Sequence, residues 1–311
     1  MSAPPPRFPV KLLLRPRNWL LWPVLGLAAL LAPLPDRALA ALSRPLGWML
    51  WRVPRVRHVT RRNIDVCLPE RPEAERAALA RATTTRFALS LLQSMRVWIV
   101  QRRDRPAYPL ARIDGGEHLS AALETGQGVL LLTCHYGAPE VHGSLTDQLP
   151  RAGRRLVGVY RQPGHDAADA VLHWARSGYC DAIIPGTDIR SIVRELRSGS
   201  LVWFAPDLEK ARKGAVYVPF FGVPAGTTTA TARLAGMGRA VVVPVRYRQD
   251  AEGRFIYDIR PPLAGFPSGD IEADTARVNV AIEDLIRDDP VPYWWCLERF
   301  LRRPDGVPPV Y

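Results

Sequence analysis

From residue 113 onward, short apolar runs alternate with segments in which apolar residues recur every three or four positions. The short runs predict buried strands, and the periodic segments predict amphipathic helices. The predicted strands are 128–134, 155–160, 182–184, 201–205, 240–246 and 254–259. The predicted helices are 117–125, 139–148, 166–178, 188–198, 227–237 and 272–288. This alternation indicates an α/β fold with a mostly parallel central sheet flanked by helices.

The part of the chain before residue 113 has a different pattern. An apolar stripe that includes Leu79, Phe87 and Trp98 predicts one long helix over 73–103. Further upstream, basic residues precede an apolar segment at 19–32 of about 14 residues, whereas spanning a bilayer upright takes about 20.

Arginines together with Trp48 and Trp51 follow this apolar segment, and that mixture suits the headgroup zone of a membrane. A cleaved signal ending near 38–40, an uncleaved anchor, an interfacial helix and a buried core helix all remain open. We favour an uncleaved membrane-associated segment. The predicted organisation is a flexible basic tip at 1–17, an anchor region at 18–58 and a catalytic domain at 59–311.

Composition narrows the classes of partner. The net charge of +12, from 42 basic and 30 acidic residues, suggests phosphate groups, acidic lipid or an acidic carrier protein. A nucleic-acid partner is not expected, because the basic stretches lack a recognisable binding motif. The four cysteines are far apart and form no C-x-x-C, which favours reduced thiols in the cytoplasm and argues against a structural zinc site.

The strongest chemical signal is at the end of the predicted strand 128–134, where His135 follows directly. Gly137 allows a turn, Pro139 suits a first helical position, and Glu140 falls in the first turn of the next helix. This strand–turn–helix corner would let the Glu140 carboxylate reach the imidazole. A histidine held by a carboxylate is a general base for an alcohol, and open α/β sheets bind ligands at such strand ends.

Other charged residues also follow predicted strands or begin predicted helices. Arg161 could grip a phosphate or carboxylate, and Asp207 could orient a basic residue. Arg212 and Lys213 form a basic loop before an aromatic stretch, and Arg233 lies one turn into a helix whose N-terminus could hold an anion. The ordinary alternatives are surface ion pairs, turn residues and an edge strand. An aromatic segment at 293–300 could touch a membrane, close over a pocket or pack in the core.

Taken in order, these blocks resemble the late acyltransferases of lipid A biosynthesis (lauroyl- and myristoyltransferases), within the wider lysophospholipid acyltransferase group. The resemblance covers nearly the whole chain. Its blocks are Arg62-Asn63-Ile64, 67–70, 116–119, 128–133, His135-x4-Glu140, 160–161, 205–207, 212–214, 218–222, 227–229 and 299–304. Inside the histidine box, Ala138-Pro139 replaces the family's usual Asn-Trp, and Leu208-Glu209-Lys210 replaces a usual Gln-Asp stretch. These differences leave the acyl chain length and the acceptor open.

The resemblance implies transfer of a fatty acyl group from an acyl carrier protein thioester to a hydroxyl of a lipid A precursor. It implies a bacterial inner-membrane location with the catalytic domain on the cytoplasmic side, and neither a metal nor a cofactor. His135 would be the base and Glu140 would orient it. The expected substrate-binding residues are Arg161, Asp207, Arg212, Lys213 and Arg233.

Three other functions stay open at this point. The chain could acylate another glycolipid or a lysophospholipid, with acyl-CoA as the alternative donor. It could be a non-catalytic lipid-binding protein that kept the fold, although the presence of both His135 and Glu140 argues against this. It could also be a hydrolase, in which the same pair activates water.

Overall fold

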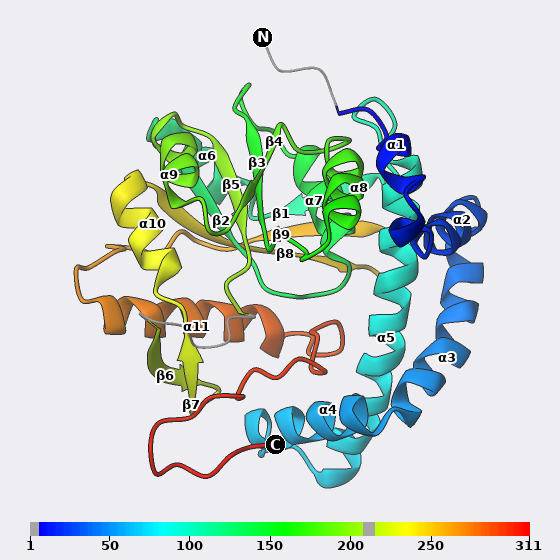
Figure 1. The fold of residues 1–311 in the computed structure, drawn as a ribbon. Helices are drawn as coiled ribbons and strands as arrows, with labels where there is room; N and C mark the ends of the chain where they lie inside the picture. The colour runs from blue at the N-terminus through cyan, green and yellow to red at the C-terminus, as the bar shows by residue number, and fades with distance from the viewer. Residues whose placement is uncertain (1–5, 208–214) are drawn as a thin grey trace.

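The computed structural model describes residues 6–207 and 215–311 (Figure 1). The strands of its main sheet are β1 (Leu110–Asp114), β2 (Val129–Leu132), β3 (Leu156–Tyr160), β4 (Ala182–Pro185), β5 (Leu201–Phe204), β8 (Val241–Gln249) and β9 (Phe255–Ile259). In the described residues their order is β1-β9-β8-β2-β5-β3-β4. Neighbouring strands are parallel, except for the antiparallel pair of β8 and β9. The predicted α/β fold with a mostly parallel sheet is confirmed.

Helices cover both faces of this sheet. Those that connect its strands or follow it are α6 (Gly116–Glu124), α7 (Pro139–Asp147), α8 (Asp166–Arg176), α9 (Ile189–Arg197), α10 (Ala230–Gly238) and α11 (Ile271–Arg287). Leu130 and Leu132 of β2 pack in the core that α9, α10 and α11 cover, whereas Val129 and Leu131 pack in the core beneath α6 and α7. Because successive strand residues point to opposite faces, a strand buried on both sides is apolar throughout.

Three strands were not among the predicted ones, although an edge strand after the basic loop was left open as an alternative. The edge strand β1 pairs with β9, and its sequence LARID has exposed positions that break the apolar signal. β6 (Val216–Phe220) and β7 (Val223–Thr227) form a separate antiparallel hairpin. Phe221 and Gly222 connect them with φ angles of 50° and 75°, as a two-residue hairpin turn requires. Phe220 and Phe221 of the predicted aromatic stretch are buried there.

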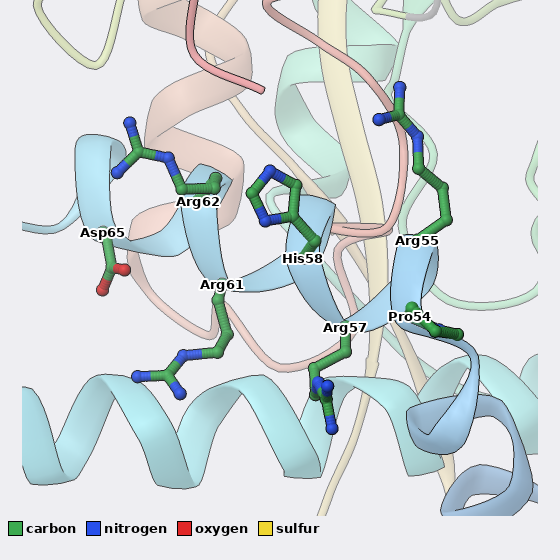
Figure 2. Close-up of a pocket in the computed structure, with 7 residues that line it drawn as sticks. All are labelled: Pro54, Arg55, Arg57, His58, Arg61, Arg62 and Asp65. Atoms are coloured by element: carbon green, nitrogen blue, oxygen red, sulfur yellow. The ribbon is translucent and has the colours of Figure 1, made fainter.

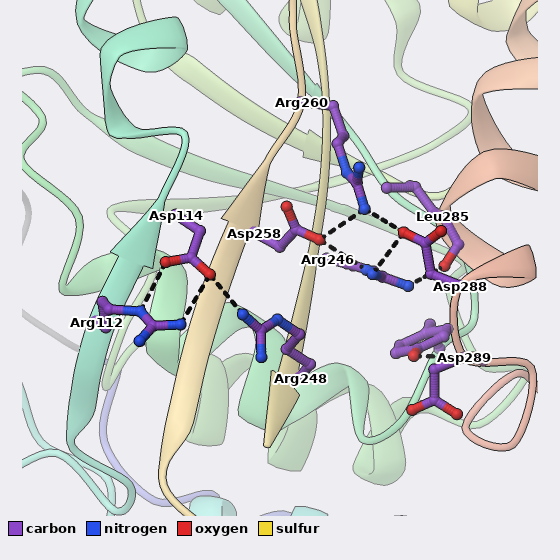
Figure 3. Close-up of polar contacts among 10 residues, drawn as sticks. Arg112, Asp114, Arg246, Arg248, Asp258, Arg260, Leu285, Asp288 and Asp289 are labelled. Carbon is purple, nitrogen blue, oxygen red and sulfur yellow. Dashed lines mark hydrogen bonds and ion pairs between the residues drawn. The ribbon is translucent and has the colours of Figure 1, made fainter. Parts of the chain in front are cut away.

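A buried arginine connects the sheet to the C-terminal end of α11 (Figure 3). The Arg246 side chain on β8 donates to Asp258 on β9 at 3.0 Å, to Asp288 at 2.9 Å and to the carbonyl oxygen of Leu285. The Leu285 carbonyl belongs to the last turn of the helix, where carbonyls lack helical partners. The chain just beyond is held in turn by Tyr136, whose hydroxyl donates to the Asp289 carbonyl at 3.0 Å.

The N-terminal third is helical and wraps around the long helix α5 (Figure 1). Its elements are α1 (Val10–Leu13), the 3₁₀ helix η1 (Pro16–Asn18), α2 (Leu21–Leu31), α3 (Asp36–Arg52), α4 (Pro54–Cys67) and α5 (Glu73–Val100). Leu31, Leu39 and Leu92 form a core between α2, α3 and α5. The predicted anchor region is therefore packed onto the rest of the molecule.

Two structural details bear on the predicted organisation of this region. Residues 10–13, inside the segment predicted as a flexible tip, form α1, because Leu13 is buried against Val171 of α8. The boundary predicted at residue 58 falls inside α4. In residues 6–207 and 215–311, no helix combines the length and apolarity that crossing a membrane requires.

Candidate active site

His135 lies just past the carboxyl end of β2, as predicted. The Thr133 amide still continues the ladder by donating to the Phe204 carbonyl at 3.0 Å. Gly137 then has a φ of 61°, a left-handed conformation that glycine adopts at little cost. α7 starts at Pro139. The predicted strand–turn–helix corner is confirmed.

Asp207 holds the imidazole. Its Oδ1 lies 2.8 Å from His135 Nδ1, and its Oδ2 accepts the His135 backbone amide at 2.9 Å. The sheet register explains the meeting. Leu132 of β2 pairs with Phe204 of the parallel neighbour β5, so His135 and Asp207 each lie three residues past a matched pair. An ionised carboxylate can only accept, and Nδ1 must therefore carry the hydrogen.

The other ring nitrogen, Nε2, is then the one with a free lone pair. Within the described residues it has no hydrogen-bond partner, and the His135 side chain keeps 20% of its surface exposed. Asp207, in contrast, is 1% exposed. An unprotonated nitrogen that solvent or substrate can reach, backed by a buried carboxylate, is the arrangement that a general base needs.

Electrostatics keep Asp207 ionised. Burial alone would raise the pKa of this carboxyl, but the charge of His135, the two hydrogen bonds from His135 and the charge of Arg299 together lower it below its ordinary value. The carboxylate therefore stays negative at neutral pH.

Glu140 has different partners from those predicted. Its buried carboxylate accepts from Arg176 Nη2 at 2.7 Å and from Arg176 Nε at 3.2 Å, and it also accepts the Tyr179 hydroxyl. No hydrogen bond joins it to His135 in the part of the chain that the structure describes. The predicted contact is therefore corrected: the Glu140 side chain points to Arg176 of α8 and to Tyr179 just after it, and Nδ1 of His135 is already bonded to Asp207.

Burial would raise the pKa of Glu140, but the charge of Arg176 and the hydrogen bonds from Arg176 and Tyr179 hold it below its ordinary range. Glu140 is thus an anion at neutral pH, paired with Arg176. It can fix the start of α7 relative to α8.

Two aromatic residues, Tyr247 and Trp294, fix the turn between His135 and α7. The Tyr247 hydroxyl accepts the Ala138 amide at 2.6 Å. It lies so close beneath Gly137 that a Cβ there would be 2.1 Å from it. Trp294 donates its backbone amide to the His135 carbonyl at 3.0 Å and its indole N–H to the Gly137 carbonyl at 2.7 Å.

The predicted aromatic segment at 293–300 therefore divides between two environments. The Trp294 ring lies against the imidazole, with centroids 5.4 Å apart, so this residue covers the candidate site. Tyr293 and Trp295 are buried in the core. The cluster of aromatic residues in the sequence indicated that this segment could close over a pocket, but it did not show which ring faces the histidine.

Arg299, in the same segment, is a buried cation that was not among the predicted site residues. Its guanidinium donates to the Gly226 carbonyl and to Thr227 Oγ1, both at 2.8 Å. Its Nε is buried and has no hydrogen-bond partner within the described residues. Burial lowers its pKa, yet an arginine stays charged at neutral pH, and this charge acts on Asp207.

Within the described residues, no hydrogen bond or ion pair connects the remaining predicted residues to His135. Arg161 is exposed after β3, which β5 separates from β2. Arg233 is exposed on α10 and donates to Thr229 Oγ1 at 2.9 Å. Arg212 and Lys213 lie outside the described residues. Within residues 6–207 and 215–311, no group of three or more His, Cys, Asp and Glu side chains is placed to hold a metal ion.

Comparisons with known proteins agree over nearly the whole chain. Residues 9–302 match the family described as bacterial lipid A biosynthesis acyltransferase. The lipid A biosynthesis lauroyltransferase of Escherichia coli K12 is 30% identical over 302 residues, which are 96% of this chain and 97% of that protein. The palmitoleoyltransferase of the same organism is 29% identical, covering 96% of each chain. Its myristoyltransferase is 26% identical over 78% of this chain and 75% of its own.

Proposed function

The chain belongs to the bacterial lipid A biosynthesis acyltransferase family, and from this premise we propose that it transfers a fatty acyl group from an acyl carrier protein thioester to a hydroxyl of a lipid A precursor. The observation that carries the proposal is the His135–Asp207 pair at the carboxyl ends of β2 and β5, with Nε2 of His135 left available. No cofactor is needed for this reaction.

In the proposed reaction, Nε2 of His135 removes the proton of the acceptor hydroxyl as its oxygen attacks the thioester carbonyl. The C–S bond then breaks, and the imidazolium returns the proton to the departing thiolate. Asp207 holds the tautomer in which Nε2 is free, and its buried charge stabilises the imidazolium between these steps. The acceptor oxygen is itself the nucleophile, so the enzyme needs none.

Glu140 has a positioning role in this proposal. The ion pair with Arg176 at 2.7 Å ties the first turn of α7 to α8, and the turn that carries His135 leads directly into α7. Arg161 and Arg233, both exposed, remain candidates for binding substrate phosphates, as do Arg212 and Lys213 outside the described residues.

We place the protein at the bacterial inner membrane, with the catalytic domain on the cytoplasmic side. Large apolar side chains of the N-terminal helices are exposed, among them Trp19 at 59%, Leu20 at 85% and Leu30 at 69%. Water would not favour so many exposed apolar groups close together, whereas a membrane interface would. The expected attachment is therefore a set of helices lying in the interface.

The test is acyl transfer by the purified full-length chain, followed by mass spectrometry of the lipid product. Lipid A precursor and a lysophospholipid are offered as acceptors, and acyl carrier protein thioester and acyl-CoA as donors. We expect one added acyl chain on the lipid A precursor, from the carrier protein thioester, by wild type and not by His135→Asn. Transfer only to the lysophospholipid, or full activity of His135→Asn, would contradict the proposal.

A further inference from the structure

The exposed side of α4 is a cationic surface with no assigned role. Arg55, Arg57, His58, Arg61 and Arg62 surround a surface depression of about 700 Å³ (Figure 2). All five side chains come from one 14-residue helix and are exposed. We call this set the α4 cation face.

Part of this charge is neutralised within the protein. Arg55 pairs with Glu298. Asp65, the one acidic residue around the depression, is held by Arg76 at 2.8 Å. Arg62 donates to the Val310 carbonyl at 2.8 Å. A carbonyl accepts the hydrogen bond but does not neutralise the charge of Arg62.

Arg57, His58 and Arg61 have no side-chain hydrogen bond or ion pair within the described residues. Arg57 and Arg61 are four residues apart, and like charges at this spacing on a helix repel each other. Asp65, one turn on from Arg61 and the acidic residue that lines the depression in the described part of the chain, is already paired with Arg76. The chain therefore keeps an unfavourable charge cluster that an external anion would relieve.

An apolar surface adjoins this face. Leu42, Met49 and Val53 on and just after α3 are 42%, 59% and 44% exposed, and their spacing of seven and four residues places them along one side of the helix. Trp48 is exposed beside them, with the Arg52 guanidinium 4.3 Å from its ring centroid. Val53 is followed directly by Pro54, the first residue of α4.

Along the chain, exposed apolar groups come first, then a tryptophan with an arginine, and then free cations. This order matches the layers of a bilayer surface. Apolar side chains enter the acyl boundary, tryptophan sits at the headgroup level, and arginines reach the phosphates. An acidic protein would also attract the cations, but it would leave the neighbouring apolar side chains uncovered. The observations therefore favour a lipid surface.

We propose that Arg57, His58 and Arg61 of α4 bind the phosphate groups of anionic bilayer phospholipids while the adjoining side chains of α3 enter the interface. This proposal rests on the membrane association proposed above and is independent of the acyl-transfer chemistry. It also orients the active site, because Asn63 on the inner side of α4 donates to the carbonyls of Trp295 and Leu297 at 2.8 and 2.7 Å, beside the Trp294 that covers His135.

The test is vesicle flotation of the full-length protein with phosphatidylcholine alone and with added phosphatidylglycerol. The variant is Arg57→Gln/Arg61→Gln. The matched control is Arg190→Gln/Arg194→Gln, two exposed arginines of α9 with the same spacing and the same change in charge. We expect the α4 variant to bind the anionic vesicles about 30-fold more weakly than wild type, on the basis of two surface arginines, while the control changes by less than about threefold.

Equal loss in both variants would mean that total charge alone matters, and it would overturn the proposal. Binding of wild type that is unaffected by phosphatidylglycerol would do the same. We expect the variants to fold like wild type, since all four arginines are exposed. Thermal unfolding of each variant checks this expectation.

A second measurement separates the bilayer from the substrates. Acyl transfer is assayed in neutral detergent micelles without anionic phospholipid, and KM is measured for each substrate. We expect both KM values of the α4 variant to stay within about twofold of wild type, because no bilayer phosphate is involved. A large rise for the lipid A precursor would assign Arg57 and Arg61 to the acceptor, and a rise for the carrier protein would assign them to the donor; either overturns the proposal. If wild type is inactive in this assay, the proposed function is contradicted. The flotation result would still decide the proposal that α4 binds anionic phospholipid.

Discussion

Asp207 and Glu140 are both buried carboxylates near the end of β2, and both have a pKa below the ordinary value, so both are ionised at neutral pH. Their partners differ in kind. Asp207 faces His135, which can gain or lose a proton and keeps a solvent-reachable nitrogen. Glu140 faces Arg176, which is always charged, and Tyr179, which is buried with it. The same side-chain chemistry therefore serves proton transfer in one place and helix packing in the other.

The largest expected effect comes from removing the base. His135→Asn should lower the rate of acyl transfer by about 10²- to 10⁴-fold, the usual contribution of a positioned general base. Because His135 is partly exposed and makes its side-chain bond only to Asp207 within the described residues, we expect little change in melting temperature. A variant with near-wild-type turnover would remove His135 from the mechanism.

Asp207→Asn should have the second-largest effect on acyl transfer, and it should lower mainly kcat. The amide keeps the shape but loses the charge that stabilises the imidazolium, and its NH2 group can hold the wrong tautomer. We expect a loss of at least about 10²-fold in kcat with a modest change in KM. Steady-state kinetics with the acceptor varied will measure the split, and a change confined to KM would point to substrate binding.

Glu140→Gln should show the opposite signature. It leaves the buried Arg176 guanidinium without its counter-charge, which costs about 3–5 kcal/mol of folding free energy. We expect a clear drop in stability to urea but less than about a tenfold loss of turnover for the folded fraction. The double variant Glu140→Gln/Arg176→Met is the control, and it should recover part of the lost stability. Loss of turnover at unchanged stability would make Glu140 a catalytic residue after all.

The same comparison predicts a pH dependence of stability. Glu140 has a pKa below its ordinary value in the folded protein, so its contribution is full above the unfolded value of about 4.3. It is lost as the pH falls through the lower folded value, since the unfolded chain then binds more protons. Urea unfolding of wild type should therefore weaken below about pH 4.3 by more than that of Glu140→Gln. Parallel curves would show that Glu140 is not stabilised by Arg176.

The smallest expected effect belongs to Tyr247→Phe. It removes the acceptor of the Ala138 amide and should cost about 0.5–1.5 kcal/mol of stability. Because the turn after His135 then loses one of its supports, a loss of turnover of about tenfold or less is expected. Thermal unfolding and turnover are measured together, with Tyr257→Phe as a control that removes a buried hydroxyl from α7 at His142 and Thr146 instead.

The local features of this fold were predictable from the sequence, and the same holds for the histidine corner. The apolar run into His135, the turn at Gly137 and the helix start at Pro139 all depend on neighbours in the chain. Strand β1 and the β6–β7 hairpin were not predicted, because their polar and proline residues weaken the apolar pattern.

The partner of His135 was harder to predict, because it depends on strand order. Asp207 is 72 residues away in sequence, and it meets His135 only because β5 lies beside β2 in the matching register. Sequence spacing instead favoured Glu140, whose true partner Arg176 is 36 residues further along. Arg299 and Trp294 reach the site from the far end of the chain, and a linear pattern does not indicate such contacts.

The roles given to Asp207 and Glu140 are tested most directly by nitrogen NMR of the protein labelled in its histidine rings. His135→Asn is used to assign the His135 signals. We expect the neutral His135 ring to carry its hydrogen on Nδ1 in wild type and in Glu140→Gln, and we expect this preference to be lost in Asp207→Asn. A neutral ring protonated on Nε2 in wild type, or a tautomer that changes with Glu140→Gln and not with Asp207→Asn, would contradict these roles.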